Sequence, residues 1–439
     1  MQLSLRDVAR FLDMPSGEPE TLITGWSIDS RTVERGDLFF AIKGEHFDGR
    51  RFVAAAFEKG AVAAIVSEPV AACAKPVLYV GDTVGALQRV ARRACERWGN
   101  PVIGVTGSAG KTGTKDVIAA LLATRLEVGK TAGNLNNHIG LPLSILRIPD
   151  SARAAVLEMG MNHAGEIHAL AEIARPQIGV VTNVGYAHIE AFSSIEGVSA
   201  AKRELIEALP ADGVAVLNAD DARVLGFAEY HKGRVLTYGT RERAQIRAEA
   251  VETGPEGSSF RVDGVTFRTK LAGRHAVLNI LAGVAVASLF DIPFRELVAP
   301  VAALQPGKMR GTRRELRGIT ILDDSYNSNP EAAQAMIDVL KRESAQRRIA
   351  VLGEMLELGE WAEQLHRELG AYAAAHGVDV VIGVRGAARF LAEEAHGMFF
   401  DDAKSAGEFL HDFLRAGDAV LFKGSRGTHL EEALATIES

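Results

Sequence analysis

Short apolar runs alternate with helical patterns along most of the chain, and this alternation predicts an α/β protein. A short helical start is followed by four apolar runs that are separated by glycine-containing turns, at residues 23–30, 38–42, 61–66 and 77–80. We predict a small α/β domain for this part of the chain.

A second group of apolar runs follows a helical pattern over residues 84–98. These runs alternate with helical stretches, which favours a mostly parallel sheet with helices on both faces; they are residues 101–105, 154–157, 178–182 and 214–217. The pair Asp263-Gly264 stands between two alternating segments and predicts a β-hairpin. We therefore expect an antiparallel β annex beside this sheet.

The polar, glycine-bearing segment 305–311 is a candidate linker. After it, strands alternate again with helices, which predicts a doubly wound, Rossmann-like domain; the strands are residues 320–322, 348–352, 378–382 and 419–422. We predict three α/β domains, with boundaries at 1–82, 83–308 and 309–439, and a P-loop-type sheet in the central one.

Composition agrees with a multidomain globular protein. The chain has 439 residues, of which 47% are hydrophobic and 24% charged, and a formal net charge of −7. That charge gives no broad basic surface for nucleic acid. Arg6, Asp7 and Arg10 interrupt the N-terminus where a signal peptide would be apolar, and the apolar stretch 276–290 is too short to span a bilayer. We expect a cytoplasmic protein that neither enters a membrane nor binds nucleic acid.

The segment 105–114 lies between an apolar strand and the start of a helix. This position predicts a site for the phosphates of ATP. Its small residues let backbone N–H groups close around phosphate oxygens, with Lys111 reaching the terminal phosphates and Thr112 available for Mg²⁺; the small residues are Gly107, Ser108, Ala109, Gly110 and Gly113. Val105 stands where the strict Walker pattern has its first glycine, so we expect a shorter or differently wound loop. The alternative is a glycine-rich turn with an exposed lysine.

Two further strands end in polar residues. Glu158 ends the run 154–157, and a carboxylate there would face a neighbouring phosphate loop, so it is a candidate Mg²⁺ ligand. His188 follows the strand at 179–183 and could also bind a metal ion. The alternatives are a solvated carboxylate at a strand end and a histidine with a structural hydrogen bond.

Lys202 lies on the apolar face of a predicted helix, together with Val198 and Leu205. Desolvation favours the neutral amine, which reacts with carbon dioxide to give a carbamate, an anionic metal ligand. The alternative is a lysine whose ammonium extends to solvent from the edge of the core.

Polar clusters elsewhere have ordinary explanations as well as chemical ones. Residues 131–138 could form a turn, and residues 323–330 could cap a helix. Residues 423–428 combine glycines with a basic pair that could bind an anion.

Taken together, these segments resemble the Mur ligases of bacterial cell-wall synthesis along essentially the whole chain. The segments that carry the resemblance are 29–31, 36–39, 106–112, 134–142, 158–161, 183–188, 201–202 and 324–330. The resemblance is closest to the ligases that join D-alanyl-D-alanine to UDP-N-acetylmuramoyl-tripeptide.

The resemblance implies a role for each domain. The first would hold the uridine diphosphate end of the substrate, with Ser30 and Arg31 as contacts. The central domain would bind ATP and two Mg²⁺ ions, one at Thr112 and Glu158 and the other at His188 and N-carboxylated (carbamylated) Lys202. Further nucleotide contacts would be Asn137, Asn279, Arg310, Asp324 and Tyr326, with Arg310 preferred over Arg313 and Arg314. The incoming dipeptide would face Lys423, Ser425 and Arg426.

The implied reaction is ATP-dependent amide formation through an acyl phosphate, with Lys111, Glu158, His188 and Lys202 as catalytic residues. A monomer is expected, with closure of the third domain on nucleotide binding. Three alternatives stay open: the sibling ligase that adds the third amino acid, a folylpolyglutamate synthase, and a nucleotide-binding regulatory protein without ligase activity. The third peptide residue is either lysine or a diaminopimelate.

Overall fold

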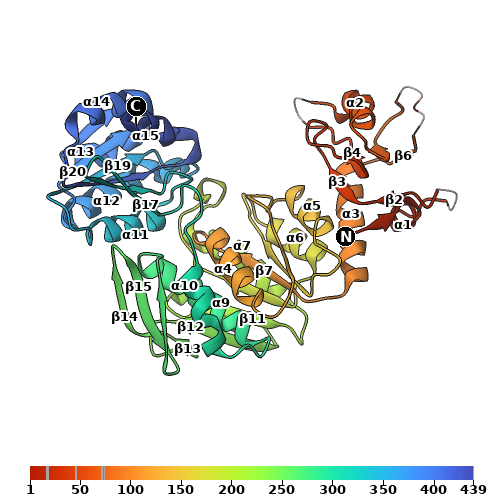
Figure 1. Ribbon diagram of the computed structural model, residues 1–439, viewed down its shortest axis with the longest axis horizontal. Helices are drawn as coiled ribbons and strands as arrows, with labels where there is room; N and C mark the ends of the chain where they lie inside the picture. The colour runs from red at the N-terminus through yellow and green to blue at the C-terminus, as the bar shows by residue number, and fades with distance from the viewer. Residues whose placement is uncertain (16–18, 45–46, 71–72, 74, 439) are drawn as a thin grey trace.

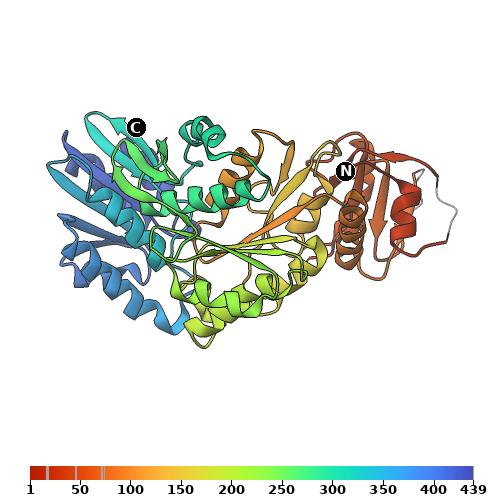
Figure 2. The same cartoon turned by 90° about the horizontal axis from the view of Figure 1, so that it is seen from below.

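Three α/β domains follow one another along the chain in the computed structural model, which describes residues 1–15, 19–44, 47–70, 73 and 75–438. The central domain lies between the other two in both views (Figures 1 and 2). The predicted fold class is confirmed, whereas the boundaries at residues 82 and 308 stay a prediction.

The N-terminal domain has a four-stranded parallel sheet, in the order β3-β4-β5-β6, and a small antiparallel pair, β1 and β2. Its elements are β1 (Leu3–Ser4), α1 (Leu5–Phe11), β2 (Leu22–Ile23), β3 (Gly25–Ser27), β4 (Asp37–Phe40), α2 (Val53–Glu58), β5 (Ala63–Val66) and β6 (Val77–Tyr79). The apolar run at 23–30 divides at Thr24, with β2 in the antiparallel pair and β3 in the parallel sheet.

The central domain is built on a seven-stranded sheet, in the order β13-β12-β11-β10-β7-β9-β8, and every pair in it is parallel. Its elements are α3 (Thr83–Trp98), β7 (Val102–Thr106), α4 (Lys111–Leu122), β8 (Val128–Lys130), α5 (Gly140–Leu146), β9 (Ala154–Glu158), α6 (Glu166–Ala174), β10 (Ile178–Val181), α7 (Ile195–Glu207), β11 (Val214–Asn218), α8 (Ala222–Gly226), β12 (Arg234–Gly239), β13 (Ile246–Arg247), α9 (Arg274–Ser288) and α10 (Val298–Ala303).

Alternating side chains of this sheet enter two separate cores. Ile103 and Val105 pack in the core that includes α4 and α9, whereas Val102 and Leu157 belong to the core on the other face, with α5, α6 and α7. Because β9, β7 and β10 are parallel neighbours, the residues that follow them meet at one edge of the sheet.

The predicted annex is a three-stranded antiparallel sheet of β14 (Glu249–Gly254), β15 (Gly257–Val262) and β16 (Val265–Thr269). Its Asp263-Gly264 hairpin is confirmed, with both residues at positive φ, 45° and 77°. Figures 1 and 2 show the annex beside the C-terminal domain, where Arg342 donates a hydrogen bond of 2.8 Å to the Thr253 carbonyl.

The C-terminal domain has a six-stranded sheet in the order β17-β18-β22-β19-β20-β21, in which only the β17–β18 pair is antiparallel. Its elements are β17 (Thr312–Leu316), β18 (Ile319–Asp323), α11 (Pro330–Leu340), β19 (Arg347–Gly353), α12 (Ala362–Ala375), β20 (Val380–Val384), α13 (Ala388–Glu394), β21 (Met398–Phe400), α14 (Ala403–Phe413), β22 (Asp418–Lys423) and α15 (Leu430–Glu438). Among the described helices, none combines the length and apolar character needed to cross a bilayer.

Candidate active site

The segment between β7 and α4 forms the loop predicted to hold phosphates. Gly107 and Gly110 have φ angles of 148° and 78°, which a side chain would strain. A Cβ on Gly107 would lie 1.8 Å from Thr182 Oγ1, and one on Gly110 would lie 2.8 Å from Asn279 Oδ1. The loop therefore needs glycine at both positions, although it lacks the first glycine of the Walker pattern.

Residues after β10 hold this loop in place. Thr182 Oγ1 donates to the Ala109 carbonyl at 2.6 Å, and Asn183 Oδ1 accepts from the Ala109 amide at 2.8 Å. The Ser108 hydroxyl exchanges hydrogen bonds of 2.8 and 2.9 Å with the Gly185 backbone. The polar groups of Ser108 and Ala109 thus support the loop itself.

The start of α4 offers donors for an anion. Amides in the first turn of a helix have no carbonyl four residues back to bond, and Lys111, Thr112 and Gly113 form that turn. The Lys111 ammonium donates to the Gly107 carbonyl at 2.7 Å. Its burial lowers its pKa, against the opposing charge of Glu158.

Glu158 ends β9 beside this loop and is 2% exposed. Asn136 donates to its Oε1 atom at 2.7 Å, while Oε2 is buried with no hydrogen-bond partner in the described part of the chain. A buried, unpartnered carboxylate oxygen is costly by itself and suits a cation ligand. The Oδ1 atom of Asn137 instead accepts from the Ile139 and Gly140 amides, at 3.2 and 2.8 Å, where α5 begins, so the structure adds Asn136 to the candidate residues.

His188 and Lys202 both follow β10 in the chain, at the start of a short turn and on α7. His188 has a left-handed backbone, with φ at 64°, and its buried Nδ1 atom faces the Glu357 carboxylate without regular hydrogen-bond geometry. Lys202 projects from α7 and is only 1% exposed. Burial sets its pKa well below the usual value, an effect that Lys111 reinforces and Glu331 opposes. The apolar helical face thus holds a buried amine, rather than one that extends to solvent.

Two carboxylates of the C-terminal domain reach this part of the central domain, and the sequence analysis missed both. Glu331, at the start of α11, accepts a hydrogen bond of 3.0 Å from the Tyr186 amide, and burial raises its pKa. Glu357 lies against His188, which lowers the pKa of this carboxyl more than burial raises it. No local pattern marks either residue, because each acquires its partners only when the two domains meet.

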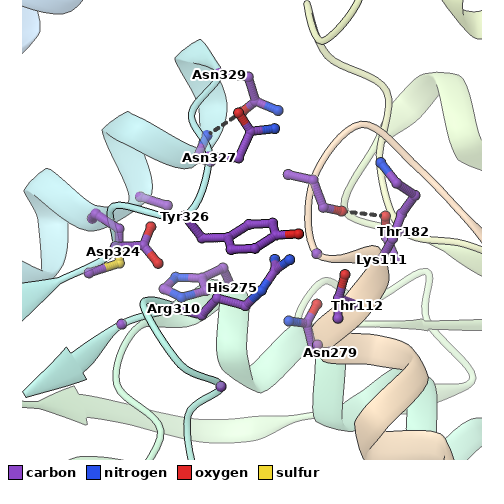
Figure 3. Close-up of a pocket in the computed structure, with 18 of the residues that line it drawn as sticks. Lys111, Thr112, Thr182, His275, Asn279, Arg310, Asp324, Tyr326, Asn327 and Asn329 are labelled. Atoms are coloured by element: carbon purple, nitrogen blue, oxygen red, sulfur yellow. Dashed lines mark hydrogen bonds between the residues drawn. The ribbon is translucent and has the colours of Figure 1, made fainter. Parts of the chain in front are cut away.

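Aromatic and planar groups gather farther along the cavity. Figure 3 shows Tyr326, His275 and Arg310 grouped together, with Lys111, Thr112 and Asn279 in the same view. Arg310 Cζ lies 3.9 Å from the centre of the Tyr326 ring. His275 is half-buried, and desolvation lowers its pKa against the opposing charge of Asp324. The sequence did carry a signal for His275, since it lies four residues before Asn279 on one face of α9.

Asn279 packs under the phosphate loop, where its Oδ1 accepts from Thr114 Oγ1 at 3.0 Å. Arg313 pairs with Glu343, and Arg314 pairs with Glu438. Of these three predicted nucleotide-side arginines, Arg310 is therefore the one that stacks on Tyr326.

The polar residues at and after the end of β22 make different contacts. Lys423 is buried, and its ammonium donates to Asp324 Oδ2 at 2.6 Å and to the Asn327 carbonyl at 2.8 Å. Ser425 Oγ accepts from the Leu356 amide at 2.9 Å. Arg426 pairs with Glu431 at 3.1 Å and retains a half-exposed side chain.

One cavity of about 1090 Å³ collects most of the predicted site residues of the central and C-terminal domains. It is lined by Ser108, Ala109, Gly110, Lys111, Thr112, Gly113, Asn137, Glu158, His188, Asn279, Arg310, Asp324, Tyr326, Lys423, Ser425 and Arg426, together with Asn136, His275, Glu331 and Glu357. Gly107 and Lys202 do not line it, and neither do Ser30 and Arg31 of the N-terminal domain. Arg31 instead pairs with Asp29 at 2.7 Å and is largely exposed. Among the described residues, no three His, Cys, Asp or Glu side chains form a ready-made metal cluster.

Nearly the whole chain matches models of known protein domains. Residues 22–135 match the model for the Mur ligase family catalytic domain, residues 105–287 the Mur ligase middle domain, and residues 309–426 the Mur ligase glutamate ligase domain. The fold, the phosphate loop and these matches define a nucleotide-binding ligase of this class. The chain belongs to the Mur ligase family.

Individual relatives are similar from end to end. The UDP-N-acetylmuramoyl-tripeptide–D-alanyl-D-alanine ligase of Bacillus subtilis strain 168 is 39% identical over 430 residues, which cover 94% of this chain and 93% of the relative. The Escherichia coli K12 protein of the same name is 32% identical and covers 98% of both chains. A crystal structure of MurF from Acinetobacter baumannii superposes with a TM-score of 0.93 at 30% identity, covering 100% of this chain and 99% of that one. MurF ligase from Thermotoga maritima, solved in complex with ADP, gives a TM-score of 0.83 at 31% identity and covers 94% and 97% of the two chains.

Proposed function

We propose that the chain joins D-alanyl-D-alanine to UDP-N-acetylmuramoyl-tripeptide and consumes ATP, a step in making the cytoplasmic precursor of peptidoglycan. The observation that carries this proposal is the single cavity in which the phosphate loop, Glu158, His188 and residues of the C-terminal domain face one another. End-to-end similarity to relatives that bear this name supports the choice of substrates over the sibling ligase.

We infer that the site binds two Mg²⁺ ions. Glu158 has a buried oxygen without a partner and Thr112 lines the same cavity, so these two residues would hold one ion. His188 and N-carboxylated Lys202 would hold the other. Bound Mg²⁺ would offset the repulsion between the substrate carboxylate and the triphosphate.

The surroundings of Lys202 support its N-carboxylation. A buried amine with a lowered pKa is neutral more readily than a free lysine. Its nitrogen forms a bond to the carbon of carbon dioxide and loses a proton, which leaves an anionic carbamate. We expect Lys202→Ala to remove turnover while circular dichroism stays that of the folded protein, and high bicarbonate not to restore it. Near-normal turnover in this variant would remove Lys202 from the site.

The reaction then needs mainly positioning and charge. Lys111 and the first-turn amides of α4 bind the terminal phosphates while the tripeptide carboxylate attacks the γ-phosphorus, forming a C–O–P bond as ADP leaves. The ammonium group of the dipeptide first loses a proton, the resulting amine attacks the acyl carbon, the bond to phosphate breaks, and a second proton leaves the nitrogen. The flat and cationic side chains of Tyr326, Arg310 and His275 would contact the adenine ring of ATP. Closure of the C-terminal domain would exclude water from the acyl phosphate.

We expect the enzyme to act as a monomer. Its cytoplasmic location follows from its use of ATP and a nucleotide-linked substrate.

The test measures phosphate release and product mass with ATP, Mg²⁺, the dipeptide and UDP-N-acetylmuramoyl-tripeptide, omitting each in turn. Dependence on all four, with a product heavier by one dehydrated dipeptide, is the expected result. Phosphate release without either peptide substrate would favour a regulatory protein. Amide formation with a single amino acid on the shorter precursor would favour the sibling ligase.

A further inference from the structure

A carboxylate of the C-terminal domain lies at the phosphate end of the cavity. Glu357 lies between β19 and α12, with φ at 63°, a left-handed conformation that residues with a side chain rarely adopt. Its carbonyl accepts a hydrogen bond of 3.1 Å from the Glu190 amide, and its carboxylate lies against His188. The charge of Lys111 also acts on this carboxylate. Contacts from the central domain therefore keep Glu357 beside the groups that the proposed reaction uses.

The cavity wall next to Glu357 has an unusual order of side chains. Leu356 is a large apolar residue that lines the cavity yet is 41% exposed. Its amide donates to Ser425 Oγ at 2.9 Å, which brings the 356–357 segment beside the residues after β22. Arg426 follows Ser425, lines the same cavity and has a side chain that is 56% exposed. The wall thus offers an anion, an apolar side chain and a cation.

This order matches the acceptor of the proposed reaction, on which the present inference rests. D-Alanyl-D-alanine carries an ammonium group at one end, a carboxylate at the other and two methyl groups between. Its nitrogen must reach the carbon that bears the phosphate, so the ammonium end must lie toward Lys111.

We propose that Glu357 binds the ammonium group of the acceptor dipeptide, while Leu356 contacts a methyl group and Arg426 faces the carboxylate. Once the ammonium has lost a proton, the amine still donates a hydrogen bond from one of its N–H groups to the same carboxylate. The residue that binds the acceptor therefore also orients its nitrogen toward the acyl carbon.

The variant Glu357→Gln tests this proposal because it keeps the shape of the side chain and removes its charge. Glu360→Gln is the matched control, since Glu360 is exposed, lies three residues away and is not among the cavity-lining residues. Each full-length variant is assayed with the dipeptide, and separately with hydroxylamine in its place. Hydroxylamine is uncharged at neutral pH, so it traps the acyl phosphate as a hydroxamate without needing an anionic partner.

In Glu357→Gln we expect kcat/KM for the dipeptide to fall by on the order of 10- to 100-fold, mostly through KM, as for the loss of a hydrogen bond to a charged group. Hydroxamate formation and its dependence on Mg²⁺ concentration should match those of Glu360→Gln, and Glu357→Asp should recover part of the dipeptide affinity.

Three results would overturn the proposal: an unchanged KM for the dipeptide, an equal loss of hydroxamate formation, or a shifted Mg²⁺ dependence. The last two would place Glu357 in phosphoryl transfer or metal binding. If the unaltered protein forms hydroxamate but no amide with the dipeptide, the proposed acceptor itself is wrong, which is a different failure.

Discussion

His366 provides a sharp test of how the segment that carries Leu356 and Glu357 is held. It is fully buried on α12, its Nε2 accepts a hydrogen bond of 3.0 Å from the Met355 amide, and its Nδ1 lies 2.6 Å from the Ala362 carbonyl. The variant His366→Phe retains a ring of similar size but removes the acceptor. A buried amide left without a partner costs about 1–3 kcal/mol, so we expect the free energy of unfolding at pH 7.5 to fall by about 2 kcal/mol.

The pH dependence of this difference is a stricter criterion. Burial lowers the pKa of His366, against the opposing effects of the Ala362 carbonyl and Glu354. At pH values below about 6.5, the pKa of a histidine in the unfolded chain, the unfolded chain therefore binds a proton that the folded chain does not. Acidification then lowers the free energy of unfolding of the unaltered protein by up to about 1.4 kcal/mol per pH unit. His366→Phe lacks this contribution, so the gap between the two proteins should narrow by up to about 2 kcal/mol between pH 7.5 and 5.

Urea denaturation, followed by circular dichroism at several pH values, measures this gap. His411→Gln, which changes an exposed histidine of α14, is the control and should shift stability by less than about 0.5 kcal/mol. A gap that stays constant or widens on acidification would refute the reasoning, because it would mean that His366 is protonated in the folded protein.

Three further predictions concern the phosphate loop, the domain contact and the metal ions. Gly110→Ala should weaken ATP binding in calorimetry and lower the free energy of unfolding by about 2–4 kcal/mol, because Gly110 has a φ of 78° and the new Cβ would lie 2.8 Å from Asn279. An ATP affinity equal to that of the unaltered protein would contradict this prediction. Gly185→Ala puts a Cβ 2.3 Å from the Glu331 carboxyl group and should lower the unfolding free energy by about 1 kcal/mol, and Glu331→Ala in the same chain should recover most of that loss. Strictly additive effects would show that the two residues do not interact. Removing Mg²⁺ with a chelator should stop phosphate release but leave the urea midpoint unchanged, and a lower midpoint would indicate a structural metal instead.

The sequence predicted the features that depend on local pattern. The glycines of the loop, the strand that ends at Glu158 and the apolar face around Lys202 all follow from spacing along one or two elements, and the structure has them where the pattern indicated. The Asp-Gly hairpin is of the same kind, because its turn type is set by the two residues themselves.

Other parts of the site depend on contacts that no short pattern records. Asn136 and Asn137 are adjacent and chemically identical, and only the fold of the 131–140 segment turns one toward Glu158 and the other toward α5. Lys423 stands beside glycines in a segment that could bind an anion, yet β22 lies beside β18 and the Lys423 ammonium donates a hydrogen bond to Asp324. Glu331 and Glu357 reach the site only through the meeting of two domains.

The short stretch after β10 serves two neighbours at once. Thr182 and Asn183 hold the phosphate loop, Gly185 bonds Ser108 on one side and leaves room for Glu331 on the other, and Tyr186 donates to that same carboxylate. A replacement that improves the fit to one neighbour is therefore constrained by the other. In a saturation library this stretch should tolerate fewer substitutions than equally buried positions in the sheet core, and evolutionary drift should be slow here even at residues that touch no substrate.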